Sequence, residues 1–233
     1  MNKIDDNGLL SEIKEFEVPE ELADKIESLI FHPFVNNQKD LTLTYVLLPR
    51  TVREEQTEEL FQARNIDIKD LTDFKVKDWY LFTKILFSAD QITLEPKLVD
   101  KELEKFKPFY DYIALNVINE PVTITSIKVN CYVTSGDDSS VIRSIHVDHG
   151  EVFKKNAIDL SMIYYVNDSS GDTHFFNDDL KLVKKVSPKK GRGILFNPTI
   201  LHAGQSPIDS SLRFFIYMRF ARNYSGDRVS FYE

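Results

Sequence analysis

The distribution of glycine is the feature that most constrains the fold of this 233-residue chain. Gly8 stands alone near the N-terminus, and the other seven of the eight glycines all follow residue 135. Glycine supplies the positive φ angles that tight turns require, and it weakens the interior of helices. The sequence therefore favours helices in its first half and short strands joined by turns in its second half.

The first half carries apolar residues at helical spacing. Pro19 followed by two glutamates is typical of a helix start. Segments 51–64, 76–89 and 98–118 repeat apolar residues at intervals of three or four positions, which predicts helices. Pro108 is expected to kink or divide the last of them.

After Pro121 the apolar pattern shifts towards a period of two, which is typical of strands. The segments are rich in β-branched and aromatic residues and are separated by turn clusters. The expected strands span 122–134, 141–148, 160–166, 173–176, 180–186, 193–196, 199–203 and 212–220. About eight strands in roughly 100 residues predict a sandwich or jelly roll. Since helices precede strands, the expected class is α+β, with the helices supporting one sheet.

Composition narrows the class of protein further. An apolar content of 42% supports a packed core, so we expect one domain over 1–233, with a mainly helical part (1–120), a β core (121–222) and a C-terminal tail (223–233).

No apolar run approaches the roughly 18 residues of a membrane helix, and we expect a cytoplasmic protein without a membrane span. The single cysteine, Cys131, fits a reducing compartment. The net charge of -8 argues against non-specific nucleic-acid binding, and the oligomeric state stays open.

Two histidines and a carboxylate are candidate metal ligands. On a strand, His146 and Asp148 point to the same face, about 7 Å apart along the backbone. The pair alone is also typical of a histidine that hydrogen-bonds a neighbouring carboxylate. His202, on the penultimate predicted strand, completes the two-histidine, one-carboxylate set of non-haem Fe(II) oxygenases, and we call these three residues the triad. A structural zinc site prefers four protein ligands, usually with thiolates, and this chain has one cysteine.

A candidate anion-binding residue begins the last predicted strand. Arg213 lies among Leu212, Phe214, Phe215 and Ile216, and an exposed position is less natural in such an apolar stretch. A guanidinium group can hold a carboxylate through two parallel hydrogen bonds. Arg213 therefore suits the far end of a dicarboxylate whose other end binds the metal. The alternative is a surface arginine on an edge strand, which is the commoner fate of arginines.

Several ordered sequence blocks together resemble one enzyme family. They are Asn130-Cys131-Tyr132, His146-Val147-Asp148, Ile163-Tyr164-Tyr165-Val166-Asn167, Gly171-Asp172-Thr173, Lys190-Gly191-Arg192 and the stretch from His202 to Arg213. Over residues 122–222 the chain resembles the Fe(II)/2-oxoglutarate-dependent dioxygenases, specifically their prolyl-hydroxylase-like branch. The resemblance implies a double-stranded β-helix, a jelly-roll and cupin-like core, with supporting N-terminal helices.

The same resemblance implies roles for individual residues. It implies that the triad binds Fe(II) and that Arg213 pairs with the distal carboxylate of the cosubstrate 2-oxoglutarate. Tyr132 and Tyr165 are implied to line the cosubstrate pocket, with Tyr165 hydrogen-bonded to the same carboxylate. The implied activity is hydroxylation of an unactivated C–H bond with O₂, releasing succinate and CO₂. The implied substrate is a prolyl, amino-acid or peptidyl group, or another small molecule.

Two other classes of protein fit the same residues. A cupin-like metal enzyme that does not use 2-oxoglutarate explains the strands and the triad but leaves Arg213 without a role. A non-catalytic jelly-roll binding module makes the spacing of His146 and Asp148 incidental.

Three further features are weaker candidates. His149 follows the triad pair and is expected to point away from it, and His174 is expected to be a plain strand residue. A basic cluster either attracts an anionic partner or keeps a hairpin soluble. The cluster consists of Lys184, Lys185, Lys189, Lys190 and Arg192.

Overall fold

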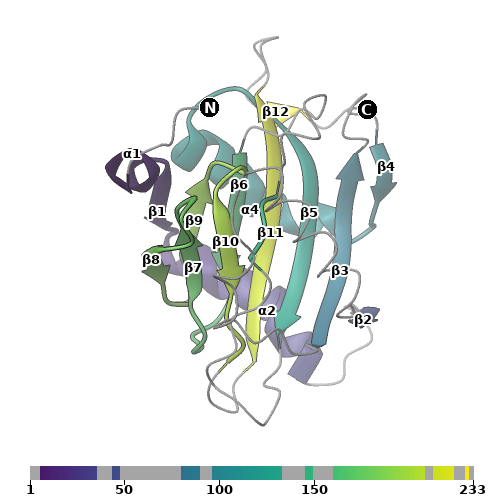
Figure 1. Cartoon of the computed structure of the whole chain (residues 1–233). Helices are drawn as coiled ribbons and strands as arrows, with labels where there is room; N and C mark the ends of the chain where they lie inside the picture. The colour runs from purple at the N-terminus through teal and green to yellow at the C-terminus, as the bar shows by residue number, and fades with distance from the viewer. Residues whose placement is uncertain are drawn as a thin grey trace.

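The described part of the chain forms two facing β-sheets with helices packed on the larger one (Figure 1). The structure is a computed structural model, and it describes residues 6–35, 44–47, 80–89, 96–132, 145–148, 160–207, 212–222 and 229–230. Among these residues, no helix is both long enough and apolar enough to cross a membrane.

The larger sheet has nine strands and the smaller sheet has three. The large sheet has the order β1 (Ile13–Glu17), β9 (Arg192–Phe196), β6 (Leu160–Tyr165), β11 (Arg213–Arg222), β5 (Val122–Tyr132), β3 (Tyr80–Ala89) and β2 (Thr44–Leu47), with β4 (Pro96–Val99) beside β3 and β12 (Val229–Ser230) beside β5. The small sheet has the order β10 (Leu201–Gly204), β7 (Thr173–Phe176) and β8 (Leu182–Val186). Its strands pair antiparallel, as do those of the large sheet apart from the parallel β12–β5 pair.

The described helices are α1 (Asp6–Ser11), α2 (Glu20–Val35), η2 (Leu103–Phe106), α4 (Lys107–Tyr112) and the π-helical turn η3 (Ile113–Ile118). The helix start predicted at Pro19 is confirmed, because the backbone N–H groups of Leu22 and Ala23 both donate to the Pro19 carbonyl. The two glutamates in the first turn of α2 interact favourably with the helix dipole.

Strands β5 and β11 are buried on both faces. Because successive side chains point to opposite faces of a strand, each strand contributes to two separate hydrophobic clusters. On one face, Val129 of β5 and Ile216 of β11 join Ile26 of α2 and Phe109 of α4 in one hydrophobic cluster. On the other face, Phe215 joins a second cluster with residues of the small sheet. The first face forms the core under the helices, and the second face looks into the space between the sheets.

The expected α+β class and the jelly-roll core are confirmed, and the fold is a double-stranded β-helix. The strands predicted at 173–176 and 193–196 lie within one residue of the observed strands β7 and β9. The helix predicted at 76–89 is wrong, because Tyr80–Ala89 is strand β3 and pairs with β5 over most of its length. Pairing with a long central strand overrides the local helical spacing there.

The remaining predictions for the first half have mixed outcomes. The segment predicted as helix at 98–118 begins in strand β4 and becomes helical only from Leu103. The helix predicted at 51–64 lies outside the described residues. In the second half, the same holds for residues 141–144 of the strand predicted at 141–148, and residues 145–148 form only an isolated bridge at His146.

Candidate active site

Backbone pairing brings the triad together from two distant segments. His146 and His202 form an isolated antiparallel bridge, in which each N–H donates to the other's carbonyl at 3.0 and 2.9 Å. Two residues further on, the N–H of Asp148 donates to the Pro198 carbonyl at 2.9 Å. One potential ligand atom from each of the three side chains lies within 4.8 Å of the others. The structure therefore places the three sequence-predicted residues at one point.

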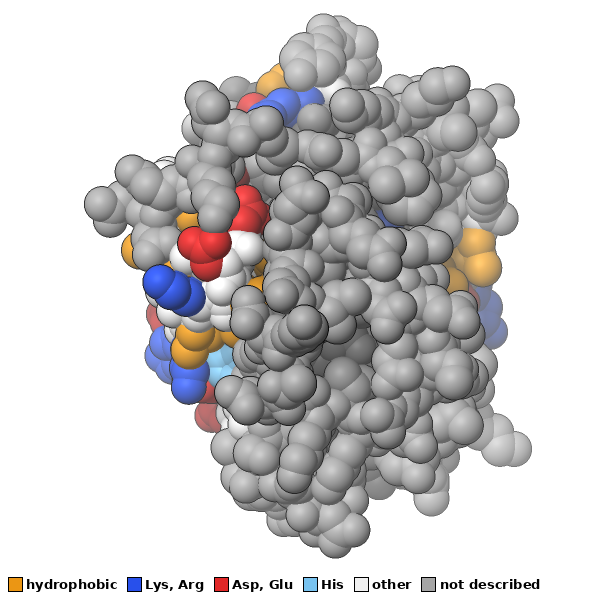
Figure 2. All heavy atoms as spheres, viewed as in Figure 1, with side chains coloured by type: hydrophobic (Ala, Val, Ile, Leu, Met, Phe, Trp, Pro, Cys, Tyr) orange, Lys and Arg blue, Asp and Glu red, His pale blue; other side chains and the backbone are white. Residues whose placement is uncertain are grey.

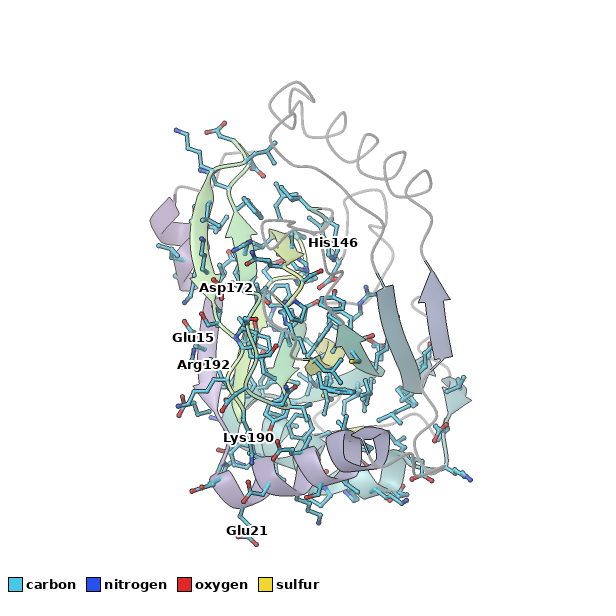
Figure 3. All side chains as sticks on the ribbon, turned by 90° about the horizontal axis from the view of Figure 1, so that it is seen from below. Glu15, Glu21, His146, Asp172, Lys190 and Arg192 are labelled. Atoms are coloured by element: carbon cyan, nitrogen blue, oxygen red, sulfur yellow. The ribbon has the colours of Figure 1, made fainter. Side chains whose placement is uncertain are left out.

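The side-chain atoms of the triad converge without bonding to one another. Asp148 Oδ1 lies 4.0 Å from His146 Nε2, and Asp148 Oδ2 lies 3.7 Å from His202 Nε2. Both distances exceed a hydrogen bond, which ends near 3.2 Å for N–H···O. In Figure 3, His146 lies on the side of the large sheet opposite to α2, in the space between the sheets.

The imidazole of His202 is held in one orientation. Its Nδ1 lies 2.9 Å from the Ile200 carbonyl, which can only accept, so Nδ1 donates and Nε2 is the nitrogen left to face the other triad atoms. The ring is 3% exposed and packs against Phe196 and Phe175, with centroid distances of 4.8 and 6.0 Å. A histidine fixed in this way by a carbonyl on its far nitrogen is typical of a metal ligand.

Asp148 is a buried carboxylate with an unsatisfied oxygen. Burial disfavours its charge, but His202, Arg219 and His146 outweigh that effect and hold the pKa of Asp148 below its usual range. Its Oδ2 is buried and has no hydrogen-bond partner among the described residues. Leaving a buried charged oxygen unpaired is costly, and a divalent cation between the triad atoms would satisfy it. Two imidazoles and one carboxylate form the donor set that suits Fe(II) with open coordination positions.

Arg213 is 1% exposed, so the alternative of a surface arginine is wrong. Its Nη1 donates to the Gln205 carbonyl at 2.9 Å and its Nη2 to Thr173 Oγ1 at 2.6 Å, whereas its Nε is buried and has no hydrogen-bond partner in the described part of the chain. No carboxylate oxygen of the described residues lies within 4.0 Å of its guanidinium group. The rings of Tyr132, Tyr165 and Phe215 surround it at 5.3 to 5.5 Å from Cζ. A buried cation without a counterion favours binding of an anion.

The two tyrosines proposed for the cosubstrate pocket lie in different places. Tyr132 lines the pocket that contains the triad and Arg213. Tyr165 is not among the residues that line it. The Tyr165 hydroxyl lies 2.6 Å from Thr173 Oγ1 and donates to the Val186 carbonyl at 3.4 Å. Thr173, for which sequence reasoning gave no role, thus stands between Tyr165 and Arg213.

One pocket of about 250 Å³ joins the triad to Arg213. Its lining includes residues that the sequence reasoning missed, namely Lys128, Asn130, Ile163, Thr173, Gly204, Phe215, Tyr217 and Arg219. The sequence held a signal for three of these residues. Phe215, Tyr217 and Arg219 follow Arg213 at intervals of two along β11, so their side chains lie on the same face of the strand as that of Arg213.

Gly204 makes room for the anion-binding end of the pocket. A Cβ atom at this position would lie 3.0 Å from the Tyr132 ring and 3.4 Å from Arg213 Nη1. Both contacts are tight for real side chains, so a glycine here lets the guanidinium and the phenol approach the β10 backbone closely.

The weaker candidates do not extend this site. His149 lies outside the described residues, and His174 is buried on β7 but is not among the pocket-lining residues. The basic cluster is largely neutralised, because Lys184 pairs with Glu15 at 2.9 Å and Lys190 pairs with Asp24 at 2.6 Å. Figure 3 shows Arg192 beside Glu15, and in the small coloured area at the left edge of Figure 2 acidic and basic side chains lie near one another. These pairs favour the solubility role over an anionic partner.

Comparison with known proteins supports the fold. No protein-family model matches the chain, and no curated protein sequence matches it. AviO1 from Streptomyces viridochromogenes Tue57 is similar in structure, with a TM-score of 0.56 and 9% identity over 97% of this chain and 98% of that chain. This likeness shows that the chain has the fold of AviO1.

Two further solved structures match with lower scores. A Pseudomonas putida prolyl-4-hydroxylase has a TM-score of 0.47 and 12% identity, over 94% of this chain and 97% of that chain. An oxidoreductase of the 2OG-Fe(II) oxygenase family from Burkholderia pseudomallei has a TM-score of 0.48 and 14% identity, over 92% and 98%.

Proposed function

We propose that this protein is an Fe(II)- and 2-oxoglutarate-dependent dioxygenase whose single domain spans residues 1–233. The observation that carries the proposal is one pocket that contains both the triad and a buried arginine with no carboxylate of the described residues within 4.0 Å. Arg213 is buried there with no counterion among the described residues, and Asp148 Oδ2 is buried there with no hydrogen-bond partner among them. A cupin-like enzyme that uses no dicarboxylate gives Arg213 no role, and a binding module explains neither group.

The proposal assigns a task to each residue. His146, Asp148 and His202 would hold Fe(II), which together with 2-oxoglutarate and O₂ supplies oxidation of a C–H bond and releases succinate and CO₂. Arg213 would hold the distal carboxylate of 2-oxoglutarate, with Tyr132 at its side. Tyr165 would act through Thr173, which orients the guanidinium group. We propose hydroxylation of a prolyl, amino-acid or peptidyl substrate, or of another small molecule.

Replacement of Arg213 tests the cosubstrate assignment. Arg213→Leu removes a charge-assisted pair, so the affinity for 2-oxoglutarate should fall by about 2–5 kcal/mol, which is roughly 30-fold or more. Calorimetric titration of the Mn(II)-loaded protein with 2-oxoglutarate measures this loss. Circular dichroism shows that the variant remains folded.

Arg222→Leu is the matched control, because Arg222 lies on the same strand but is exposed and pairs with Glu120 at 3.2 Å. It should bind 2-oxoglutarate as the unmodified protein does. If the unmodified protein does not bind 2-oxoglutarate, or if a folded Arg213→Leu binds it equally well, the proposed function is wrong.

A further inference from the structure

Two further cationic side chains, Lys128 and Arg219, line the same pocket at some distance from Arg213. Lys128 lies on β5 opposite Tyr217 of β11, and Arg219 follows two residues later on β11. Arg213 and Arg219 are six residues apart on one strand, so their backbones are separated by about 20 Å. The pocket therefore has a cation at each end of its β11 wall, with the triad carboxylate beside Arg219.

Arg219 is held in place by its neighbours. Its Nη2 lies 3.7 Å from Asp148 Oδ1, and its Nε donates to the Tyr217 hydroxyl at 2.6 Å. The side chain is 19% exposed. Arg219 is thus partly neutralised by Asp148 and cannot turn away from the pocket without breaking both contacts.

Lys128 has no such partner among the described residues. No described carboxylate lies within 4.0 Å of its ammonium group, and the residue is only partly exposed. Burial, followed by the charge of Arg219, lowers the pKa of Lys128 against the opposing effect of Asp148. An ammonium group in this position gains free energy from an added anion.

The proposed cosubstrate does not supply that anion. Among the described residues, the pocket lining contains three cations, Lys128, Arg213 and Arg219, against the single carboxylate of Asp148. A bound Fe(II) adds two positive charges, and 2-oxoglutarate brings only two negative ones. The pocket therefore still carries excess positive charge at its Lys128 end when metal and cosubstrate are both bound.

We propose, as an extension of the proposed function, that Lys128 and Arg219 bind a carboxylate of the primary substrate. The substrate is then a small organic acid or a molecule with a free carboxylate, and not an internal residue of a peptide chain. Ile163 and Phe215 line the same pocket and would contact the apolar part of such an acid. An uncharged substrate would leave Lys128 without a counterion among the described residues.

Paired ligands that differ only in charge test this inference. The Mn(II)-loaded protein, saturated with 2-oxoglutarate under anaerobic conditions, is titrated calorimetrically with L-proline, L-leucine and 3-phenylpropanoate, and separately with the primary amide of each. At least one acid should bind, and its amide should bind about 10-fold or more weakly, since a charged pair contributes 1.5–3 kcal/mol.

Substitution of Lys128 links that preference to this residue. Lys128→Met should lose about 10-fold or more in affinity for the acid. It should leave the amide and 2-oxoglutarate unchanged. Lys128→Arg should keep most of the affinity, and Lys107→Met, which removes an exposed lysine of α4, should behave as the unmodified protein.

The outcomes separate this inference from the proposed function. If 2-oxoglutarate binds but no acid binds, or if acid and amide bind equally, the inference is wrong and the proposed function stands. If Lys128→Met weakens 2-oxoglutarate itself, Lys128 belongs to the cosubstrate site and the inference is wrong. If 2-oxoglutarate does not bind the unmodified metal-loaded protein, the proposed function fails and the inference fails with it.

Discussion

At the residue scale, buried polar atoms without partners mark the places where this protein departs from an ordinary core. Folded proteins satisfy nearly all such atoms, so each exception calls for a physical reason. Asp148, with its Oδ2, and Arg213, with its Nε, line the same pocket, and a metal ion and an anionic ligand would interact with these two side chains. Both nitrogens of His174 also have no hydrogen-bond partner among the described residues, but His174 does not line that pocket.

His174 should make the protein sensitive to acid. Burial, with Lys185 nearby, lowers the pKa of His174 to about 4. Its pKa in the unfolded chain is about 6.5. Between these values the unfolded state binds a proton that the folded state does not, so the free energy of unfolding falls as the pH decreases from about 6.5 to about 4. His174→Leu should reduce the loss between pH 7.5 and pH 5 by about 2 kcal/mol.

Urea unfolding of the metal-free protein at the two pH values measures this difference. The other titrating groups are present in both proteins, so comparing the two losses isolates His174. Equal losses in the variant and the unmodified protein would show that His174 is not buried in its neutral form.

At the scale of elements, two turns need glycine for different reasons. Gly171 precedes β7 and has a φ of +88°, and Gly191 precedes β9 and has a φ of +83°. A Cβ atom at Gly171 would lie 2.6 Å from the Ser206 carbonyl oxygen, whereas one at Gly191 meets nothing closer than 3.4 Å. At Gly171 a side chain would clash with the backbone and would also need an unfavourable φ, whereas at Gly191 only the φ is unfavourable.

Alanine substitutions should separate these two costs. Gly191→Ala should lower the free energy of unfolding by about 1–2 kcal/mol, which is the cost of the left-handed conformation alone. Gly171→Ala should lower it by roughly 1–3 kcal/mol more, because the β10 end must move away from the new methyl group. Urea unfolding of both variants measures the two losses in the free energy of unfolding. Equal losses would contradict the steric explanation.

At the scale of the whole molecule, the site draws its residues from both sheets. Arg213 and Lys128 come from the large sheet, His202 and Thr173 come from the small sheet, and His146 pairs with the small sheet through β10. A ligand that contacts side chains from both sheets links the large sheet to the small sheet. Binding should therefore stabilise the folded state as a unit.

Metal and cosubstrate should raise the midpoint of thermal unfolding. At concentrations 100 times their dissociation constant, a bound ligand adds about 2.7 kcal/mol. For a chain of this size that corresponds to an increase of roughly 5–10 °C. Mn(II) with 2-oxoglutarate should produce this shift, and a chelator should reverse it.

His202→Ala should remove the metal-dependent shift, because it deletes a ligand. His174→Leu is the matched control, since it replaces another buried histidine of the small sheet outside the pocket, and it should keep the full shift. A shift that survives in His202→Ala would place the metal elsewhere.

The sequence by itself determined the features that depend on local geometry. Side chains two residues apart share one face of a strand, so the pattern predicted most of the β core. The same rule placed His146 and Asp148 together, although the structure has only an isolated bridge at His146 there and no strand. Apolar neighbours around Arg213 indicated its burial. Each of these conclusions needs only the residues next to it in the chain.

Only the tertiary structure decided how distant segments meet. Tyr80–Ala89 is a strand because it pairs with β5. The Tyr165 hydroxyl contacts Thr173 because β7 of the small sheet comes close to β6 of the large sheet. Lys128 and Arg219 share a pocket because β5 and β11 are neighbours in the sheet. The physical reason is that strand pairing joins residues far apart along the chain, and the period of a single segment carries no information about its partner.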